Sequence, residues 1–157
     1  MKPLTPSGKK RVKITVGILF AAAAILQLWK WHWPEASVVL SGRELRVQVA
    51  KTFYHQHRGL GGREALAPYD GLLFPFGIPS RYAFVMRDMR FPIDIIWFRG
   101  GAVVDIAPNV QPENRPEEQL TRYYPRTEAD LALEVPAGWA ERHGVKLGDR
   151  ISTLKAD

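Results

Sequence analysis

A long apolar run near the start of the chain limits the structures open to its first 33 residues. Between positions 14 and 29 the only polar side chains are Thr15 and Gln27. As a helix this run is about 24 Å long, and continuing it through Trp33 gives about 30 Å, the thickness of a bilayer's hydrocarbon core. The run predicts a single transmembrane helix over 14–33, with the rest of the chain outside the membrane.

The residues that flank this run predict its orientation. Lys and Arg crowd positions 1–13, whereas tryptophans at positions 29, 31 and 33 crowd the other end, as aromatic rings do at a headgroup interface. We therefore expect a basic cytoplasmic tail over 1–13 and an extracytoplasmic, periplasmic domain tethered to the cytoplasmic (inner) membrane.

Two other structures compete with the anchor. A signal peptide cleaved near Ala22-Ala23-Ala24 would release a secreted domain, although residues 25–29 would then remain as an apolar mature terminus. A buried helix of a soluble domain is disfavoured, because the run has no polar stripe of helical period. Both membrane interpretations send the domain across the membrane, and the choice between anchor and cleaved leader stays open.

The charge distribution argues against a nucleic-acid partner. Of 22 Lys and Arg residues, six lie in the first 33 positions, which hold no acid, and the other 16 balance the 16 Asp and Glu residues. A nucleic-acid-binding domain needs a basic face on the domain itself. The chain also has no cysteine, which excludes disulfides, thiolate zinc sites, iron–sulfur clusters and a catalytic thiol.

From Glu35 onward, short apolar segments are separated by Gly, Pro and Asn. Alternating side chains predict a hairpin around 41–44, and two glycines at 100–101 predict a tight turn. A helix is expected from Thr52, its N-cap, to Arg58, and a second helix at 137–143. Strands are predicted at 38–40, 45–49, 71–76, 81–87, 93–98, 102–107, 131–135 and 150–154.

Eight short strands and two short helices predict a mainly β, α+β domain, built as a small closed or half-closed barrel. The segment 34–43 is expected to hold a linker and the first strand, and 44–154 the body of the β-rich domain. Because the linker is only a few residues long, the domain is expected to lie against the outer membrane surface.

Several short motifs stand in the order and approximate spacing of one known family. They are Gly59-Leu60, Gly71-Leu72-Leu73-Phe74, Phe84-Val85-Met86-Arg87-Asp88-Met89, Pro92-Ile93-Asp94-Ile95-Ile96-Trp97-Phe98, Leu133-Glu134-Val135-Pro136-Ala137-Gly138 and Gly148-Asp149. From about 44 to 154 the chain resembles the bacterial and archaeal family called domain of unknown function 192. Leu72 and Gly61 depart from it, since such proteins often carry Met or another larger residue there. The resemblance implies a compact β-rich domain, often behind a signal or anchor segment, with no settled activity.

Two carboxylates interrupt apolar strands and are the main candidates for a site. Asp94 lies in the run 93–98, on the same strand face as Ile96 and Phe98, and Glu134 lies in the run 131–135. A buried carboxylate must be paired, hydrogen-bonded or protonated. One hypothesis makes the two an acid/base or ligand-gripping pair, with Arg87 holding an anion. The alternative is structural, with either carboxylate bonding backbone amides at a turn or pairing with Arg87.

The proline-rich stretch 108–126 is the second candidate region. A connection this long is uncommon in a compact domain unless it is a lid, a binding loop or disordered. Tyr82, Tyr123 and Tyr124, together with nearby arginines, are candidates to stack on a sugar ring or on a partner's side chains. The alternative is a solvated loop whose tyrosines pack back onto the barrel.

No metal site and no cofactor are expected. His55 and His57 would lie about 200° apart on the predicted helix, His143 lies on the other helix and His32 near the membrane interface, so no familiar three-ligand set forms. Surface positions are expected for the helix histidines. The sequence contains no GxxxxGK phosphate loop, GxSxG elbow or HExxH motif.

These features predict a membrane-anchored extracytoplasmic domain that acts as a binding or accessory module at the cell envelope. Its expected partners are the membrane that holds its anchor and an envelope protein or polysaccharide. The alternative is a small glycan-acting or other hydrolase that uses Asp94 and Glu134, held about 5 to 10 Å apart in one cleft. A third hypothesis is an assembly subunit whose exposed apolar patch docks on another membrane protein. No motif in the sequence supports an enzyme.

Overall fold

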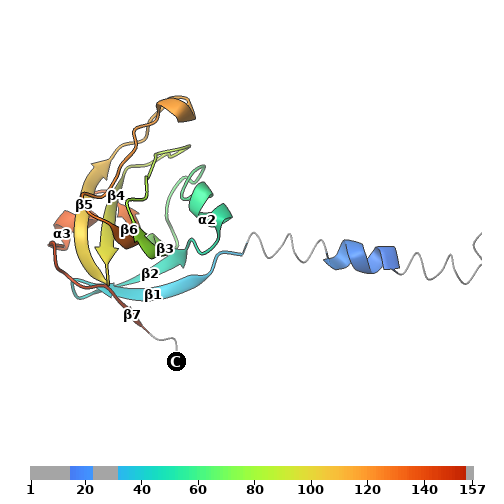
Figure 1. Ribbon diagram of the computed structural model, residues 1–157, viewed down its shortest axis with the longest axis horizontal. Helices are drawn as coiled ribbons and strands as arrows, with labels where there is room; N and C mark the ends of the chain where they lie inside the picture. The colour runs from blue at the N-terminus through green and yellow to red at the C-terminus, as the bar shows by residue number, and fades with distance from the viewer. Residues whose placement is uncertain (1–14, 23–31, 155–157) are drawn as a thin grey trace, which may run out of the picture. The chain divides into compact units, whose positions relative to one another are not determined.

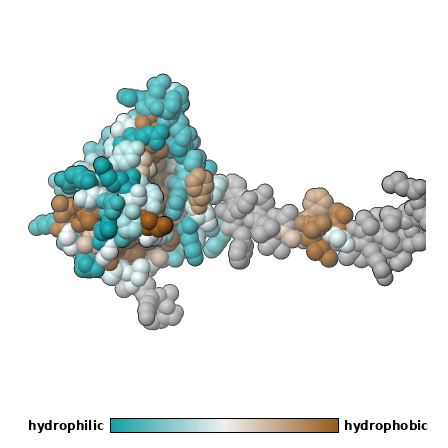
Figure 2. Space-filling view, viewed as in Figure 1, coloured by the Kyte–Doolittle hydropathy of each residue, from teal (hydrophilic) through white to brown (hydrophobic). Residues whose placement is uncertain are grey.

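The computed structural model describes residues 15–22 and 32–154, and the chain divides into two compact units, 1–33 and 34–157. Residues 15–22 are helical and mostly apolar (Figures 1 and 2). Within the described ranges, no helix is both long enough and apolar enough to cross a membrane. The expected basic tail over 1–13 lies outside these ranges, as does half of the expected transmembrane segment over 14–33.

The second unit is built on one seven-stranded sheet (Figure 1). Its strands are β1 (Glu35–Leu40), β2 (Arg43–Val49), β3 (Gly71–Ser80), β4 (Ile93–Arg99), β5 (Ala102–Val110), β6 (Ala129–Pro136) and β7 (Ser152–Leu154). The order across the sheet is β5-β4-β6-β3-β2-β1-β7. Neighbouring strands are antiparallel except for β2 and β3, which run parallel.

The sheet curls until its two edges meet at one end. Ala102, at the start of β5, forms a bridge with Arg150, just before β7. The amide of Ile151 donates to the carbonyl of Gly101 at 2.9 Å. The domain is therefore a mainly β half-barrel, in agreement with the predicted fold class.

Two tight turns form where the sequence predicts them. Ser41 and Gly42 connect β1 to β2 with φ of 48° and 72°, and Gly100 and Gly101 connect β4 to β5 with φ of 56° and 79°. Two consecutive positive φ values suit a two-residue hairpin, because their twist matches that of the flanking strands. Glycine adopts this backbone without steric cost, which explains the pair at 100–101.

The helices of the domain are short. Helix α2 (Phe53–Arg58) begins after Thr52, whose hydroxyl accepts a hydrogen bond from the amide of His55, and ends at Gly59 with φ of 53°. Helix α3 (Trp139–Arg142) lies within the predicted range 137–143. A 3-10 turn, η1 (Glu117–Gln119), interrupts the long connection between β5 and β6.

One predicted strand, at 81–87, is wrong, so the sheet has seven strands rather than eight. This segment makes a single bridge, from Phe84 to Tyr123, and otherwise crosses one face of the sheet. Phe84 and Met86 are buried and alternate with more exposed neighbours. Buried and exposed side chains do alternate along this segment, as in a strand. Such alternation shows that one side of the segment is covered, but it does not show that its backbone pairs with another strand.

The two faces of the sheet carry different side chains. On one face Leu73, Leu133 and Ile96 lie in register across β3, β6 and β4 and join the main hydrophobic core, which α3 covers through Ala140. On the other face a row crosses four strands, and its members are Gln48, Leu72, Glu134 and Ile95. Figure 1 shows α2 and α3 on opposite sides of the sheet. Because successive side chains of a strand alternate, a shift of one residue moves a side chain from one face to the other.

A candidate ligand pocket

A pocket of about 250 Å³ opens on the face of the sheet that carries Glu134. It lies between the end of α2, the strands β3 and β6, and the segment that follows β3. Its lining residues are Gln56, His57, Arg58, Gly59, Leu60, Gly61, Phe74, Phe76, Tyr82, Ala83, Phe84, Val85, Arg87, Met89 and Glu134. Three predicted site residues, Tyr82, Arg87 and Glu134, therefore meet in one place.

Aromatic rings form one wall of the pocket. Phe76 and Tyr82 stack with ring centroids 4.1 Å apart, and Phe84 meets Phe74 edge-on at 5.1 Å. Phe84 also packs edge-on against Trp97 of β4, at 5.8 Å, which fixes it to the sheet. The hydroxyl of Tyr82 donates to the carbonyl of Ile78. The stacked rings present flat, apolar surface to whatever occupies the pocket.

Glu134 is the acid on the pocket wall, and the protein does not fully satisfy it. Its side chain is 6% exposed, and among the described residues its Oε2 atom has no hydrogen-bond partner. Burial raises the pKa of Glu134 to about 8, although the positive charge of Arg63 opposes the increase. At neutral pH the side chain is therefore mostly a neutral carboxylic acid, which can donate one hydrogen bond and accept others.

Arg63 stands over the polar end of the row that contains Glu134. Its guanidinium donates to the side-chain oxygen of Gln48 at 2.6 Å, and Gln48 lies in register with Leu72, the neighbour of Glu134 across β3 and β6. Burial lowers the pKa of Arg63, and the positive charge of Arg58 lowers it further. Two arginines thus approach one another near the pocket, which favours an anion in their surroundings.

Arg87 lies at the boundary of the pocket and is held by two groups. Its Nη1 donates to the carbonyl of His57 at 2.7 Å, and its Nη2 forms an ion pair with Glu117 of η1. The hydrogen bond from Arg87 holds the pKa of Glu117 below its ordinary value. This ion pair between Arg87 and Glu117 holds the loop between β5 and β6 beside the pocket.

Gly61 fits because the chain passes very close to the backbone of Arg87. A Cβ atom at this position would lie 2.7 Å from the carbonyl oxygen of Arg87 and 3.2 Å from that of Arg58. The amide of Gly62 donates to the carbonyl of Asp88 at 2.8 Å and holds the two segments together. This close approach between the backbones of Gly61 and Arg87 explains why a glycine, and not a larger residue, occupies position 61 in this chain.

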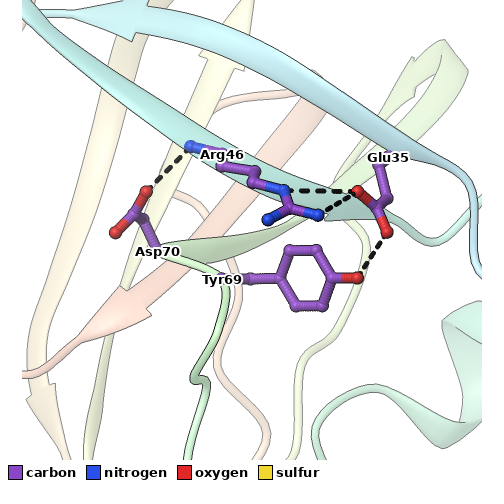
Figure 3. A network of polar contacts seen from close by, with 4 residues as sticks. All are labelled: Glu35, Arg46, Tyr69 and Asp70. Atoms are coloured by element: carbon purple, nitrogen blue, oxygen red, sulfur yellow. Dashed lines mark hydrogen bonds and ion pairs between the residues drawn. The ribbon is translucent and has the colours of Figure 1, made fainter.

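A second polar network fastens the segment before β3 to the first hairpin. Figure 3 shows Glu35 between the side chains of Arg46 and Tyr69, while Asp70 faces the backbone of Arg46. The amide of Arg46 donates to Asp70 at 2.8 Å, and the amide of Asp70 donates back to the carbonyl of Arg46 at 2.8 Å. This network is exposed and positions the chain that enters β3 without contributing to the pocket.

Asp94 lies on the opposite face of the sheet from Glu134. In the β4–β6 register Asp94 faces Val135, whereas Glu134 faces Ile95, so their side chains point to different sides. Asp94 is fully buried and accepts three backbone hydrogen bonds, from Asn109 at 2.8 Å and from Gly138 and Ala140 at 2.9 Å. It therefore bonds backbone amides, as the structural alternative expected, and fixes the start of α3.

Tyr123 and Tyr124 do not reach the pocket. Tyr123 is half-buried and pairs through its backbone with Phe84, and Tyr124 is exposed with the guanidinium of Arg81 5.9 Å from its ring centroid.

The connection that carries these tyrosines is tied to β5 by a buried acid that the sequence did not single out. Asp105 accepts from the amide of Arg126 at 2.7 Å and from its Nε at 2.8 Å. Burial pushes the pKa of Asp105 up, but the hydrogen bonds from Arg126 and from the amide of Ile106 outweigh it and keep the pKa low.

The expectation that the helix histidines lie at the surface is wrong for His55. His57 is exposed as predicted, but His55 is 2% exposed and belongs to the interior rather than the surface of α2. His143 stacks on Trp139 and bonds its carbonyl oxygen. Within residues 15–22 and 32–154, no group of three or more His, Asp or Glu side chains is placed to hold a metal ion.

Sequence reasoning missed several of the residues that line the pocket. His57 and Arg58 belong to a helix of six residues, and nothing in the local sequence indicates which side of it faces the sheet. The sequence predicts a strand for Phe74 and Phe76 but no role in a site. The motif Gly59-Leu60 is the available signal, because it marks the turn that brings α2 back to the sheet.

Fold and pocket define a mainly β half-barrel with a small, partly cationic pocket on one face. Residues 36–153 match the domain of unknown function 192 (DUF192), described as Uncharacterized ACR, and the chain belongs to this family. The family resemblance found in the sequence is thus confirmed. No curated protein matches the chain.

Two solved structures are similar to this chain. A candidate transcription regulator from Sinorhizobium meliloti 1021 is 28% identical with a TM-score of 0.69, and the match covers 77% of this chain and 95% of that one. A protein of unknown function from Novosphingobium aromaticivorans DSM 12444 is 29% identical with a TM-score of 0.68, covering 75% and 84%. Both similarities cover most of each chain and support the half-barrel as the shared fold.

Proposed function

We propose that this chain is a binding module that captures a small ligand in the pocket between α2 and the sheet, tethered at the outer face of the cytoplasmic membrane. The observation that carries the proposal is the buried carboxyl of Glu134 on a pocket wall, with its Oε2 unpartnered among the described residues. Buried polar groups are ordinarily hydrogen-bonded, so a ligand group supplies the missing partner. Apolar walls with a few placed polar groups are typical of small-molecule sites.

The size of the pocket limits the ligand. A volume of about 250 Å³ lies below the range of about 300 to 1,000 Å³ that is usual for drug-sized ligands. A molecule of about one ring suits it, either free or as the end of an envelope polysaccharide. Such a ring can lie against Phe76 and Tyr82, whose stacked faces line the pocket.

The geometry does not favour a two-carboxylate hydrolase. Such an enzyme needs both carboxyl groups on either side of one scissile bond. Asp94 and Glu134 point to opposite faces of the sheet, and Asp94 is saturated by backbone amides. We therefore propose binding rather than hydrolysis.

The tether rests on the sequence of the first 33 residues, where a basic cluster precedes an apolar run. The membrane and an envelope protein or polysaccharide are then the expected partners. A carboxyl-terminal alkaline phosphatase fusion should be active and a matched fluorescent-protein fusion dark, since the first reporter matures only outside the cytoplasm. Fluorescence from the second fusion without phosphatase activity would overturn the tethered topology. The same fusions lacking residues 1–33 are the control and should reverse the pattern.

The pocket is tested with three probes that share a phenyl ring: benzoate, benzyl alcohol and benzylamine. Ligand-observed NMR should detect binding of at least one of them. Ala83→Trp should abolish that binding, because Ala83 lines the pocket and the indole would fill it. Ala65→Trp, at an exposed position outside the lining, is the matched control and should bind as the unmodified chain does. Absence of binding by all three probes, or unchanged binding by Ala83→Trp, would overturn the proposal.

A further inference from the structure

The charged and polar groups of the pocket are unevenly distributed. Arg58 and Arg87 lie on its lining, while the one acid among the lining residues is Glu134. Arg58 is exposed, and no hydrogen bond or ion pair engages its guanidinium within residues 32–154. Because the acid is mostly neutral at pH 7 and the arginines are charged, the pocket presents net positive charge.

The two ends of the pocket are chemically different. Arg58 is the last residue of α2, and Arg87 donates to the carbonyl of His57 on the same helix, so the two lining arginines both lie at the α2 side of the pocket. Glu134 instead belongs to β6, in the middle of the sheet. The rings of Phe74, Phe76 and Tyr82 complete the lining.

We propose that the pocket takes a small organic anion built on one ring, with its anionic group at the Arg58 and Arg87 end and a hydrogen-bond-accepting oxygen at Glu134. The ring lies among the aromatic side chains, and Glu134 donates to the far oxygen. This inference rests on the proposed function of the same pocket and names its ligand class.

The protein already places one carboxylate at the arginine end. Glu117 of η1 forms an ion pair with Arg87, and its side chain is 57% exposed. The ion pair with Glu117 shows that the guanidinium of Arg87 can bind a carboxylate, the same kind of group that an anionic ligand would carry. Glu117 is therefore an internal competitor, which a ligand displaces.

The groups that face Glu134 decide how binding depends on pH. Arg63 approaches it from the segment after α2, and His57 and Arg58 of α2, Arg87 and the Arg87-bound Glu117 lie around the rest of the pocket. Arginines stay charged throughout the accessible range. Histidine side chains can exchange a proton near neutral pH, so His57→Gln is included as a control. Glu134 remains the group whose ionisation would remove a donor from the far end of the ligand.

Four probes separate the two ends: 4-acetylbenzoate carries both the anion and the second oxygen, benzoate only the anion, acetophenone only the second oxygen, and benzylamine a cation. Dissociation constants are measured by NMR titration at pH 7. We expect 4-acetylbenzoate to bind most tightly and benzylamine most weakly. The acetyl group should improve binding over benzoate by about fivefold, the usual effect of one added hydrogen bond.

Substitutions test which residues bind the anionic group of the probes. Arg58→Gln should weaken both benzoates by about tenfold, as expected for a lost charge-assisted hydrogen bond, and should leave acetophenone unchanged. Arg43→Gln, at an exposed position on β2 outside the pocket lining, is the matched control. Glu117→Gln should strengthen binding of both benzoates by up to about fivefold, because a competing exposed ion pair is removed. Glu118→Gln, the exposed neighbour on the same turn, should not.

The pH dependence tests the role of Glu134. With a pKa of about 8, the neutral fraction falls about tenfold between pH 7 and pH 9. The advantage of 4-acetylbenzoate over benzoate should therefore disappear by pH 9. Glu134→Gln keeps a donor and should retain the advantage at both pH values, whereas Glu134→Leu should lose it at both. Taking a ratio of two benzoates cancels the effect of His57 on their shared anionic group, and His57→Gln verifies this.

The outcomes distinguish this inference from the function on which it rests. Absence of binding by every probe would overturn the binding pocket itself. Tighter binding of acetophenone or benzylamine than of benzoate would leave the pocket standing and overturn the anionic ligand. An acetyl advantage that is absent at pH 7, or that survives at pH 9 in the unmodified chain, would overturn the role given to Glu134.

Discussion

Asp94 and Glu134 lie on neighbouring strands, one residue apart in register, yet their surroundings are opposite. Both are buried, with exposed fractions of 0% and 6%. Asp94 receives three backbone amides from two other segments, whereas Glu134 keeps an oxygen without a partner among the described residues. Burial therefore does not by itself mark a functional residue. What distinguishes the two acids is whether the protein satisfies the buried group.

The largest effect is expected from removing Asp94. Asp94→Ala should lower the free energy of unfolding by about 3 kcal/mol or more, because three amide donors lose their acceptor, and Asp94→Asn by about 2 kcal/mol. In the asparagine variant an NH₂ group must replace one carboxylate oxygen that now accepts. Urea unfolding at pH 7 measures both variants. Asp88→Asn, at an exposed position with positive φ that asparagine tolerates, is the control. An Asp94→Asn protein as stable as the control would contradict the structural role.

Glu134 should instead make stability depend on pH. Its pKa in the folded protein is about 8, above the 4.5 of an ordinary glutamate, so the folded state holds a proton that the unfolded state has released. Its contribution to stability is fully present below about pH 4.5 and is lost as pH rises through 8. Between pH 6 and pH 8 the loss should be about 2 kcal/mol. Urea unfolding should show this loss in the unmodified chain but not in Glu134→Gln.

The comparison between these two chains cancels every pH-dependent contribution that they share. If both chains lose stability equally between pH 6 and pH 8, Glu134 is not a protonated buried acid.

A smaller effect on stability is expected at Asp105, and its pH dependence runs in the opposite direction to that of Glu134. This carboxylate is buried, but hydrogen bonds from Arg126 and Ile106 keep its pKa low. Its contribution is therefore present above the ordinary aspartate pKa and is lost as pH falls. Asp105→Asn should cost about 1 kcal/mol at pH 7, and the difference from the unmodified chain should shrink toward pH 3. A difference that stays constant with pH would contradict the assignment.

The smallest effect is expected at the exposed acid Glu35. It bonds Arg46 and Tyr69 at the surface (Figure 3), where water screens the charges and competes for the same hydrogen bonds. Glu35→Gln should leave the midpoint of urea unfolding unchanged within error, at both low and high salt. A loss as large as that of Asp105→Asn would show that exposure does not separate these acids.

The sequence predicted most of the secondary structure because its signals are local. The glycine pair at 100–101, the N-cap Thr52 and the alternation at 45–49 each act within a few residues, and each element formed as expected. The segment 81–87 shows the limit of such signals. Its buried and exposed side chains alternate because one side of the segment packs on the sheet. Its one β-bridge is to Tyr123, which is distant in the sequence.

The candidate site was predictable only in part. Asp94 and Glu134 were both identified as acids within apolar strands, but the pairing of β4 with β6 joins residues about 40 positions apart, and no local pattern fixes that register. A shift of one residue would have put both on one face. Arg58 and His57 entered the pocket because Gly59 and Gly61 turn the chain back against Arg87, a long-range contact of the same kind.

The position of β1 also has a mechanical consequence. Pro34, where the domain begins, accepts a hydrogen bond from Val49, and β1 is flanked on both edges by β2 and β7. Six residue pairs join β1 to β2 and three join it to β7. The first strand of the domain is therefore an interior strand of the sheet, and freeing it would break two ladders of backbone hydrogen bonds.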